Sequence, residues 1–139
     1  MASGPYTLAS NVATLLNGSL TAGATLAFAP SLDIGDTTNR VVLVVPRSVE
    51  EDLQTRSGVA MQTMACDIGV LKKTGTSTSS IEAELVFCES VASALRTWRP
   101  TNGTAIVGVK IDPLYIQKHL SELGQFTSIL TVSALRAVQ

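Results

Sequence analysis

Alternating apolar and polar positions predict a half-buried strand between Val59 and Lys72. Its even positions from 64 to 70 are apolar, whereas the odd ones are small or polar, and this period of two is typical of a strand with one buried face. A second strand is predicted at Arg40–Val45, whose unbroken β-branched run suits burial on both faces or a subunit contact. Pro46 is expected to end it. Leu26–Pro30 is expected to form an edge strand, because proline cannot donate to a central ladder.

Helical spacing of apolar residues predicts a short amphipathic helix near the start of the chain. It covers Thr7–Leu16, with Thr7 as the N-cap and Asn17-Gly18 as the stop. Gly18–Thr25, rich in small residues, is expected to be a loop. Ser48–Glu51 has the spacing of a capping box and predicts one or two helical turns to about residue 54.

The strongest helical pattern lies in the middle of the chain. Ser79–Glu82 has capping-box spacing, an apolar stripe continues to Leu95, and Pro100 stops the helix. We expect this helix to lie across the sheet as its main cover, with Trp98 anchoring its end. Its acidic residues are placed off the apolar stripe: Glu82, Glu84 and Glu89.

The last quarter of the chain predicts two antiparallel strands joined by a short helix. Val107, Val109 and Ile111 are expected to share one face of the first strand, and the second is predicted over Phe126–Val132. A face of the second strand is formed by Leu130, Val132 and Ala134. The connector from Leu114 to Leu123 is predicted to be helical and to end at Gly124. The chain, residues 1–139, is therefore predicted to be a single α+β domain. It has a mixed, largely antiparallel sheet, one long helix packed across it, and short N-terminal and C-terminal connector helices.

Charged residues are scarce for a chain of this size. They make up 15% of its 139 residues, against 45% hydrophobic residues, whereas about 25% is usual for soluble domains. Too few charges remain to coat the outside, so a homo-oligomer is favoured. The longest apolar run is far shorter than the roughly 20 residues of a membrane span, and no signal peptide is visible, so no membrane association is expected. Lys72-Lys73 is interpreted as the charged end of an exposed edge strand.

The sequence offers little for catalysis. It contains one histidine, His119, and no metalloprotease, nucleophile-elbow or dinucleotide-binding motif. Gly75–Ser80 lacks the second glycine and the lysine of a P-loop, so a flexible turn is expected there. Cys66 and Cys88 lie on apolar faces and are expected to be buried thiols rather than a disulfide or metal pair. We therefore expect no enzyme activity, no cofactor and no metal, and the net charge of −1 argues against tight nucleic-acid binding.

Several segments, taken in order, resemble a known family of structural proteins. The chain from about residue 35 to 135 is similar to the tail terminator and tail-completion (neck) proteins of long-tailed bacteriophages. The segments that carry this resemblance are Val41–Pro46, Arg56, Cys66–Lys73, the long helix, Ile111–Tyr115 and Phe126–Thr131. No single segment is specific to this family, and the resemblance is carried by the order of the segments along the chain. The serine/threonine-rich helix start and the apolar ending Ala134–Val138 depart from the family pattern.

The resemblance implies a mixed sheet with a packed helix, and a hexameric ring. Such a ring caps the tail tube, stops its polymerisation, joins the neck or connector, and lets DNA pass without specific binding. The protein would then be found in the tail or neck of the virion, and in the host cytoplasm during assembly. Loops at the sheet ends are the implied contacts between rings, and the candidate residues here are Arg47, Arg56, Gly75, Thr76, Ser77 and Thr78. Arg56 matches the family's arginine. Its side chain is expected either to form an ion pair between subunits or simply to lie at the surface.

A second function class stays open. The chain could be a small α+β binding module that dimerises through Val41–Val45 or recognises a peptide by strand addition. A ring and a small module differ in mass and in their appearance under the electron microscope.

Overall fold

The computed structural model describes residues 4–20, 23–28, 39–53, 60–75, 77–100, 104–112 and 114–138. In chain order the elements are α1 (Gly4–Leu20), β1 (Thr25–Leu26), β2 (Val41–Leu53), β3 (Ala60–Lys73), α2 (Thr78–Thr97), β4 (Ala105–Ile111), α3 (Gln117–Leu123) and β5 (Gln125–Val138). This is the predicted α+β class, and the elements follow one another in the predicted order.

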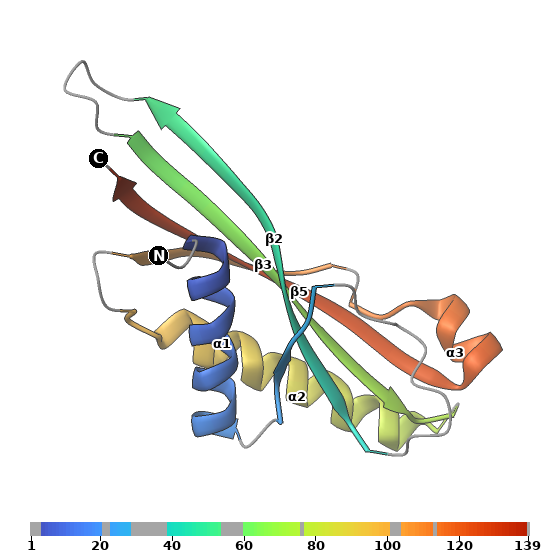
Figure 1. Ribbon diagram of the computed structural model, residues 1–139. Coiled ribbons are helices and arrows are strands. Elements are labelled where there is room, and N and C mark those ends of the chain that lie inside the picture. Colours follow the sequence, from blue (N-terminus) through green and yellow to red (C-terminus); the bar gives the residue numbers. More distant parts are fainter. Residues whose placement is uncertain are drawn as a thin grey trace.

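The five strands form one sheet in the order β1-β2-β3-β5-β4. Only β1 and β2 run parallel, and every other neighbouring pair is antiparallel. The long strands β2, β3 and β5 make a strongly twisted ribbon (Figure 1). The predicted antiparallel pairing of the last two strands is confirmed, with Ile111 opposite Leu130. The sequence did not predict that β3 pairs with β5 along its entire length, from Ala60–Val138 to Lys73–Gln125.

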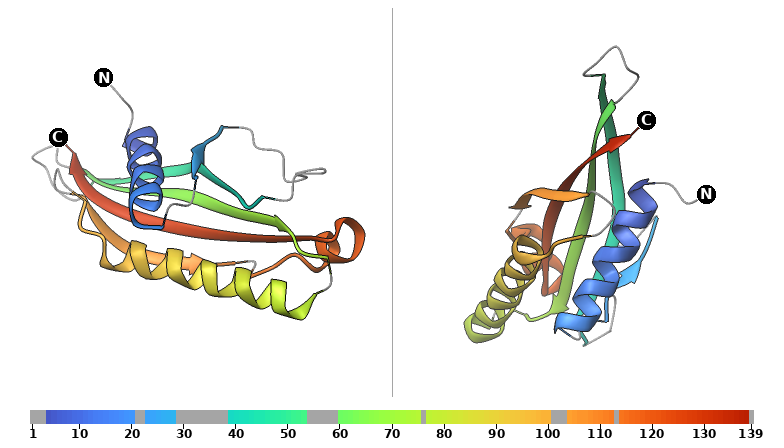
Figure 2. Two further views of the ribbon diagram at one scale, coloured as in Figure 1. Left: turned by 90° about the horizontal axis from the view of Figure 1, so that it is seen from below. Right: turned by 90° about the vertical axis from the view of Figure 1, so that its left-hand side faces the viewer.

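Both long helices cover the same face of the sheet. Figure 2 shows α1 over β2 and β3, and α2 along β5 and β4. The core is the single apolar layer between helices and sheet, and its larger members are Leu8, Val12, Leu16, Val42, Val44, Met64, Cys66, Ile68, Val70, Cys88, Val91, Leu95, Phe126, Leu130 and Val132. The predicted alternation in β3 is confirmed, because its even positions from 64 to 70 are all buried.

Strand β2 continues far past the residue that was expected to end it. Pro46 lies inside β2, where the register with β3 shifts between Pro46 and Ser48 in a β-bulge. The helical turns predicted for Ser48–Glu51 are wrong, because this segment pairs with β3. Continuous pairing with a neighbouring strand has outweighed a local capping signal. Of the two interpretations of Arg40–Val45, burial on both faces is wrong within the chain, since Val42 and Val44 are buried and their neighbours only half-buried. The other, a subunit contact, stays a prediction.

Helix α1 is longer than predicted at both ends. Asn17-Gly18 does not stop it, and the helix continues to Leu20, so the predicted loop begins later. The Asn17 side chain instead holds the following segment. Its Oδ1 accepts a 2.6 Å bond from the Ala24 N–H, and its Nδ2 donates to the Ala24 carbonyl at 3.1 Å. Both bonds fix the chain just before β1, an edge strand that shares only Leu26 with the predicted strand Leu26–Pro30. Residues 29 and 30 lie outside the described part of the chain.

Helix α2 begins before its predicted capping box. Its N-cap is Ser77, whose hydroxyl accepts from the Ser80 N–H at 3.5 Å. The predicted stripe is confirmed at Cys88, Ala92 and Leu95, but Glu84 was wrongly placed off it, because its side chain is also buried. The interpretation of Lys72-Lys73 as an exposed edge is wrong as well, since β3 is the central strand.

The apolar face predicted for β4 is interrupted. A register shift between Ile106 and Gly108 leaves Val107 56% exposed, whereas Val109 and Ile111 pack on the core. The bulge adds one residue, so Ile106 takes the inward position that alternation would have given to Val107.

Candidate functional site

Arg47 lies in the bulge of β2, on the sheet face turned away from α1 and α2. Its Nη1 is 3.3 Å from Asp67 Oδ1 on β3 and 3.3 Å from Thr131 Oγ1 on β5. Thr131 in turn donates to Asp67 at 2.7 Å. Arg47 remains 58% exposed, so this three-strand polar cluster can still meet another chain.

Gly75 and Ser77 lie elsewhere, in the turn between β3 and α2, and Thr78 is the first residue of α2. The N–H groups of Thr74 and Gly75 both donate to the Gly124 carbonyl, at 3.0 and 2.8 Å. This turn is therefore bonded to the α3–β5 turn, and the expected free flexible tip is wrong for its described part. Six residues of β3 follow Asp67 before the strand ends at Lys73, which is roughly 20 Å of strand. The structure thus divides the predicted contact residues between two places. Arg56 and Thr76 lie outside the described residues.

Gly124 is the predicted helix end, and its conformation makes it sensitive to substitution. It has φ of 61° in the left-handed region, and a Cβ there would lie 3.5 Å from the Gly75 Cα. We expect Gly124→Ala to lower the free energy of unfolding by about 1–2 kcal/mol, measured by urea denaturation. Gly18→Ala is the matched control, because Gly18 is helical with open space around its Cα. It should raise stability by roughly 0.5–1 kcal/mol, and equal effects at both positions would contradict the argument.

The face of the sheet opposite the helices carries a row of half-buried apolar side chains, which we call the open face. Register and alternation place these residues on it: Val41, Leu43, Val45, Met61, Ala65, Ile129 and Leu135. One end is closed by α3, where His119 Nδ1 lies 2.8 Å from Thr127 Oγ1 and Leu71 is fully buried. Within the described chain no helix covers the rest (Figures 1 and 2). Such a face suits contact with another protein.

Both edges of the sheet are also open in the described chain. β1 pairs with β2 only at Leu43 and Val44, and the Ala27 N–H adds a 2.9 Å bond to the Val44 carbonyl. Beyond this, β2 from Val45 to Leu53 has no described strand on its outer side, and neither has β4. Open edges of this kind are sites of strand pairing between chains.

Four of the seven large apolar side chains that are exposed in the described chain are at or next to these two edges. Val49 of β2 is 45% exposed, and Tyr6 of α1 and Phe28, which follows β1, are exposed by 43% and 71%. The Tyr6 and Phe28 rings stack with centroids 6.3 Å apart. On β4 the exposed residue is Val107. Sequence reasoning missed these positions, because the bulge that exposes Val107 depends on its pairing with β5.

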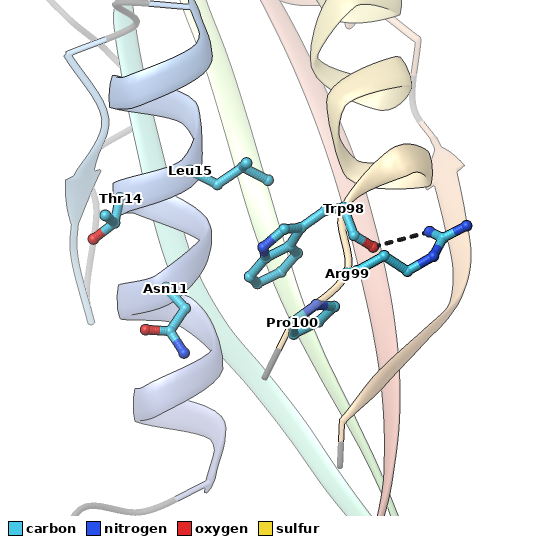
Figure 3. A pocket seen from close by; sticks show the side chains of 6 residues that line it. All are labelled: Asn11, Thr14, Leu15, Trp98, Arg99 and Pro100. Carbon is cyan, nitrogen blue, oxygen red and sulfur yellow. Dashed lines mark hydrogen bonds between the residues drawn. The ribbon is translucent and has the colours of Figure 1, made fainter. Parts of the chain in front are cut away.

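A recess lies where the C-terminal end of α2 meets α1. Its volume is about 260 Å³, and it is lined by Asn11, Thr14, Leu15, Trp98, Arg99 and Pro100. Figure 3 shows the Trp98 indole between Leu15 and Pro100, while the Arg99 side chain extends away from α1. The Arg99 guanidinium donates to the carbonyls of Arg96 and Trp98. The described lining residues include no carboxylate, histidine or thiol, so these residues supply no acid–base group.

The buried ionisable groups of the described core are one ion pair, Arg40–Glu84, and two thiols, Cys66 and Cys88. Glu84 is 2% exposed and accepts two 2.6 Å bonds from Arg40, whose guanidinium also lies 3.8 Å from the centre of the Phe87 ring. This bond raises the pKa of Arg40. Burial raises the pKa of Cys66 to about 12, and burial also raises that of Cys88. Both thiols are buried and free, as predicted, and protonated thiols are poor nucleophiles and poor metal ligands.

Among the described residues, no group of three or more His, Cys, Asp or Glu side chains could hold a metal ion. In the same part of the chain, no helix combines the length and apolarity needed to cross a bilayer.

The similarity to known proteins is one of structure. No family model matches the chain, and no curated protein matches it. Among solved structures, the chain is similar to the sheath/tube terminator of an extracellular contractile injection system, PVC, in its extended state, with a TM-score of 0.45 and 16% identity. The match covers 100% of this chain, which spans 57% of the length of that protein.

Proposed function

We propose that the chain is a structural subunit of the tail of a phage-like particle. In this proposal, copies form a hexameric ring that caps the tail tube, ends its polymerisation and joins it to the neck or connector. The particle's tail or neck is its final location, reached after assembly in the host cytoplasm. The observation that carries the proposal is the open face together with the open edges of β2 and β4. Together they expose apolar surface that another chain can cover. The resemblance to tail terminator proteins over residues 35–135 is the reason for proposing a ring on the tail tube.

The mechanism is steric and cohesive rather than chemical. Heterologous contacts that close on themselves make rings, whereas the same contacts left open make fibres. A terminator needs one surface complementary to the tube and another that does not repeat the tube's own contact. We propose neither a catalytic group nor a cofactor. DNA would pass through the ring without specific binding, in keeping with ten basic and eleven acidic residues.

The ring is tested by its mass and its image. At high protein concentration we expect light scattering to give six times the 14.6 kDa mass of one chain, and negative-stain microscopy to show closed rings. Because a terminator subunit can stay monomeric until it meets the tube, the same images are taken after mixing with purified tail tubes. Rings seated on tube ends, with tubes that stop growing, are the expected result. A stable monomer or dimer that never binds tube ends would contradict the proposal.

A binding module is the second candidate, and the open outer edge of β2 is the observation that favours it. A module of this kind would remain a monomer or dimer and bind an extended peptide along that edge. The two functions therefore give different results after mixing with tail tubes, because only the terminator forms rings on tube ends.

A further inference from the structure

The second half of β2 has an outer edge that no described strand covers. β1 pairs with Leu43 and Val44, and the Ala27 N–H adds its bond to the Val44 carbonyl at 2.9 Å. From there to the end of β2 at Leu53, the sheet stops at β2 within the described chain. A further strand can therefore continue the line of β1 along this edge.

The register shows which backbone groups of this edge point outward. Val44 turns its carbonyl toward β1, and the direction of the backbone groups alternates along a strand. Pro46 therefore also faces outward, where its missing N–H removes no bond to β3. The bulge between Pro46 and Ser48 adds one residue. After the bulge the odd positions face outward, so Val49 and Glu51 present their N–H and C=O groups to an added strand.

The side chains along this edge make it acidic. Val49, Glu50 and Glu51 are all exposed. Register and alternation place Glu50 on the open face, and Val49 and Glu51 on the face of the helices. Glu51 accepts a 3.0 Å bond from Gln62, a neutral donor that leaves its charge in place. The nearby cation, Arg47, is already in an ion pair across the sheet, so the edge has an excess of negative charge on both faces.

This charge argues against a second copy as the partner of the edge. Two β2 edges paired with each other would bring four glutamates together, and like charges on facing strands are destabilising. The β4 edge of another copy has one cation, Lys110, which is 3.3 Å from Asp112 of its own chain. A strand that complements Glu50 and Glu51 must therefore come from a different protein.

We infer that the outer edge of β2 binds an extended segment of another protein, in which two consecutive basic residues lie opposite Glu50 and Glu51 and an apolar residue lies opposite Val49. Backbone bonds to Val49 and Glu51 hold the added strand, and the two cross-strand ion pairs select it. The inference goes beyond the ring of the proposed function and does not depend on it.

Two short synthetic peptides with capped ends test this chemistry on the full-length protein. Both are rich in valine and threonine, and one has two lysines beside a central valine where the other has two glutamates. We expect only the lysine peptide to bind, measured by fluorescence anisotropy of the dye-labelled peptide. Glu50→Gln combined with Glu51→Gln should weaken this binding about tenfold. Glu82→Gln combined with Glu89→Gln is the matched control, because it removes two exposed charges of α2 and should leave binding unchanged.

Val49→Pro tests the backbone contact separately from the charges. The Val49 N–H faces away from β3, so proline removes a bond to the added strand and none between β2 and β3. We expect binding of the lysine peptide to be lost while circular dichroism shows a folded protein. If this variant does not fold, the Glu50/Glu51 variant decides, because glutamine at position 51 can still accept the bond from Gln62.

Several outcomes would overturn the inference. They are no binding of the lysine peptide, equal binding of both peptides, unchanged binding by a folded Val49→Pro variant or by the Glu50/Glu51 variant, and an equal loss in the α2 control. Imaging of rings on tube ends is a separate measurement. Rings without peptide binding would overturn this inference alone, whereas peptide binding by a chain that never forms rings would support it and contradict the terminator function.

Discussion

Replacing Arg40 with alanine should lower the free energy of unfolding by about 3 kcal/mol, because it leaves the Glu84 carboxylate buried without its partner. Glu84 is 2% exposed, and both of its oxygens accept bonds from Arg40. Arg40 is itself 32% exposed and part of its charge is already hydrated, so we take the lower end of the range for buried pairs. Urea denaturation followed by circular dichroism measures the loss.

Two further variants control this experiment. Arg40→Met combined with Glu84→Met removes both charges and should recover most of the lost stability, because apolar residues of similar size can replace a buried ion pair. Lys110→Ala removes one partner of an exposed pair, with side chains 73% and 64% exposed, and should change stability by roughly 0.5 kcal/mol or less. If Arg40→Ala behaves like Lys110→Ala, the pair does not fasten α2 to the start of β2.

Stability should fall steeply in alkaline solution because of Cys66. In the folded protein burial raises the pKa of this thiol from 9.0 to about 12, while the unfolded chain ionises near the ordinary value. Between those two pKa values only the unfolded state loses the proton, so rising pH favours unfolding. The stabilising contribution of the protonated thiol is complete below pH 9 and is lost as pH rises toward 12. The slope is at most about 1.4 kcal/mol per pH unit for this group.

Comparison with Cys66→Val isolates this effect from other groups that titrate at high pH. Free energies of unfolding are measured by urea titration at intervals from pH 8 to 11. We expect the variant to lose less stability per pH unit than the parent above pH 9, whatever its stability at pH 8. Parallel curves for the two proteins would show that Cys66 is accessible to water in the folded state.

The sequence predicted correctly those helices and strands whose pattern of apolar and polar residues lies within one segment. The alternation around Met64–Val70 and the stripe from Cys88 to Leu95 both reflect burial against a single layer, so each was visible in one segment. The errors occur where a partner strand or a distant residue decides the outcome. Ser48–Glu51 has a helix-start signal but pairs with β3, and Glu84 is a charged residue buried because Arg40 lies across from it.

Of the candidate contact residues, some could be predicted from the sequence and others only from the structure. The composition indicated that part of the surface is covered by another chain, and Arg47 is indeed on an exposed sheet face. The pairing of the strands is what gives Val49 and Val107 their positions, since two bulges set which residues face outward. A single sequence carries no signal for a bulge in β4, because the extra residue is defined only relative to β5.

The place of β5 between β3 and β4 has a consequence for folding. β3 finds its long partner only after α2, β4 and α3 have been synthesised, so the sheet is completed by contacts of large sequence separation. Folds of this kind are slow to form, because loop-closure entropy is lost before the pairing compensates for it. Until β5 is in place, the apolar strand β3 has an open edge on a growing chain. The nascent chain is therefore most prone to aggregate during this interval.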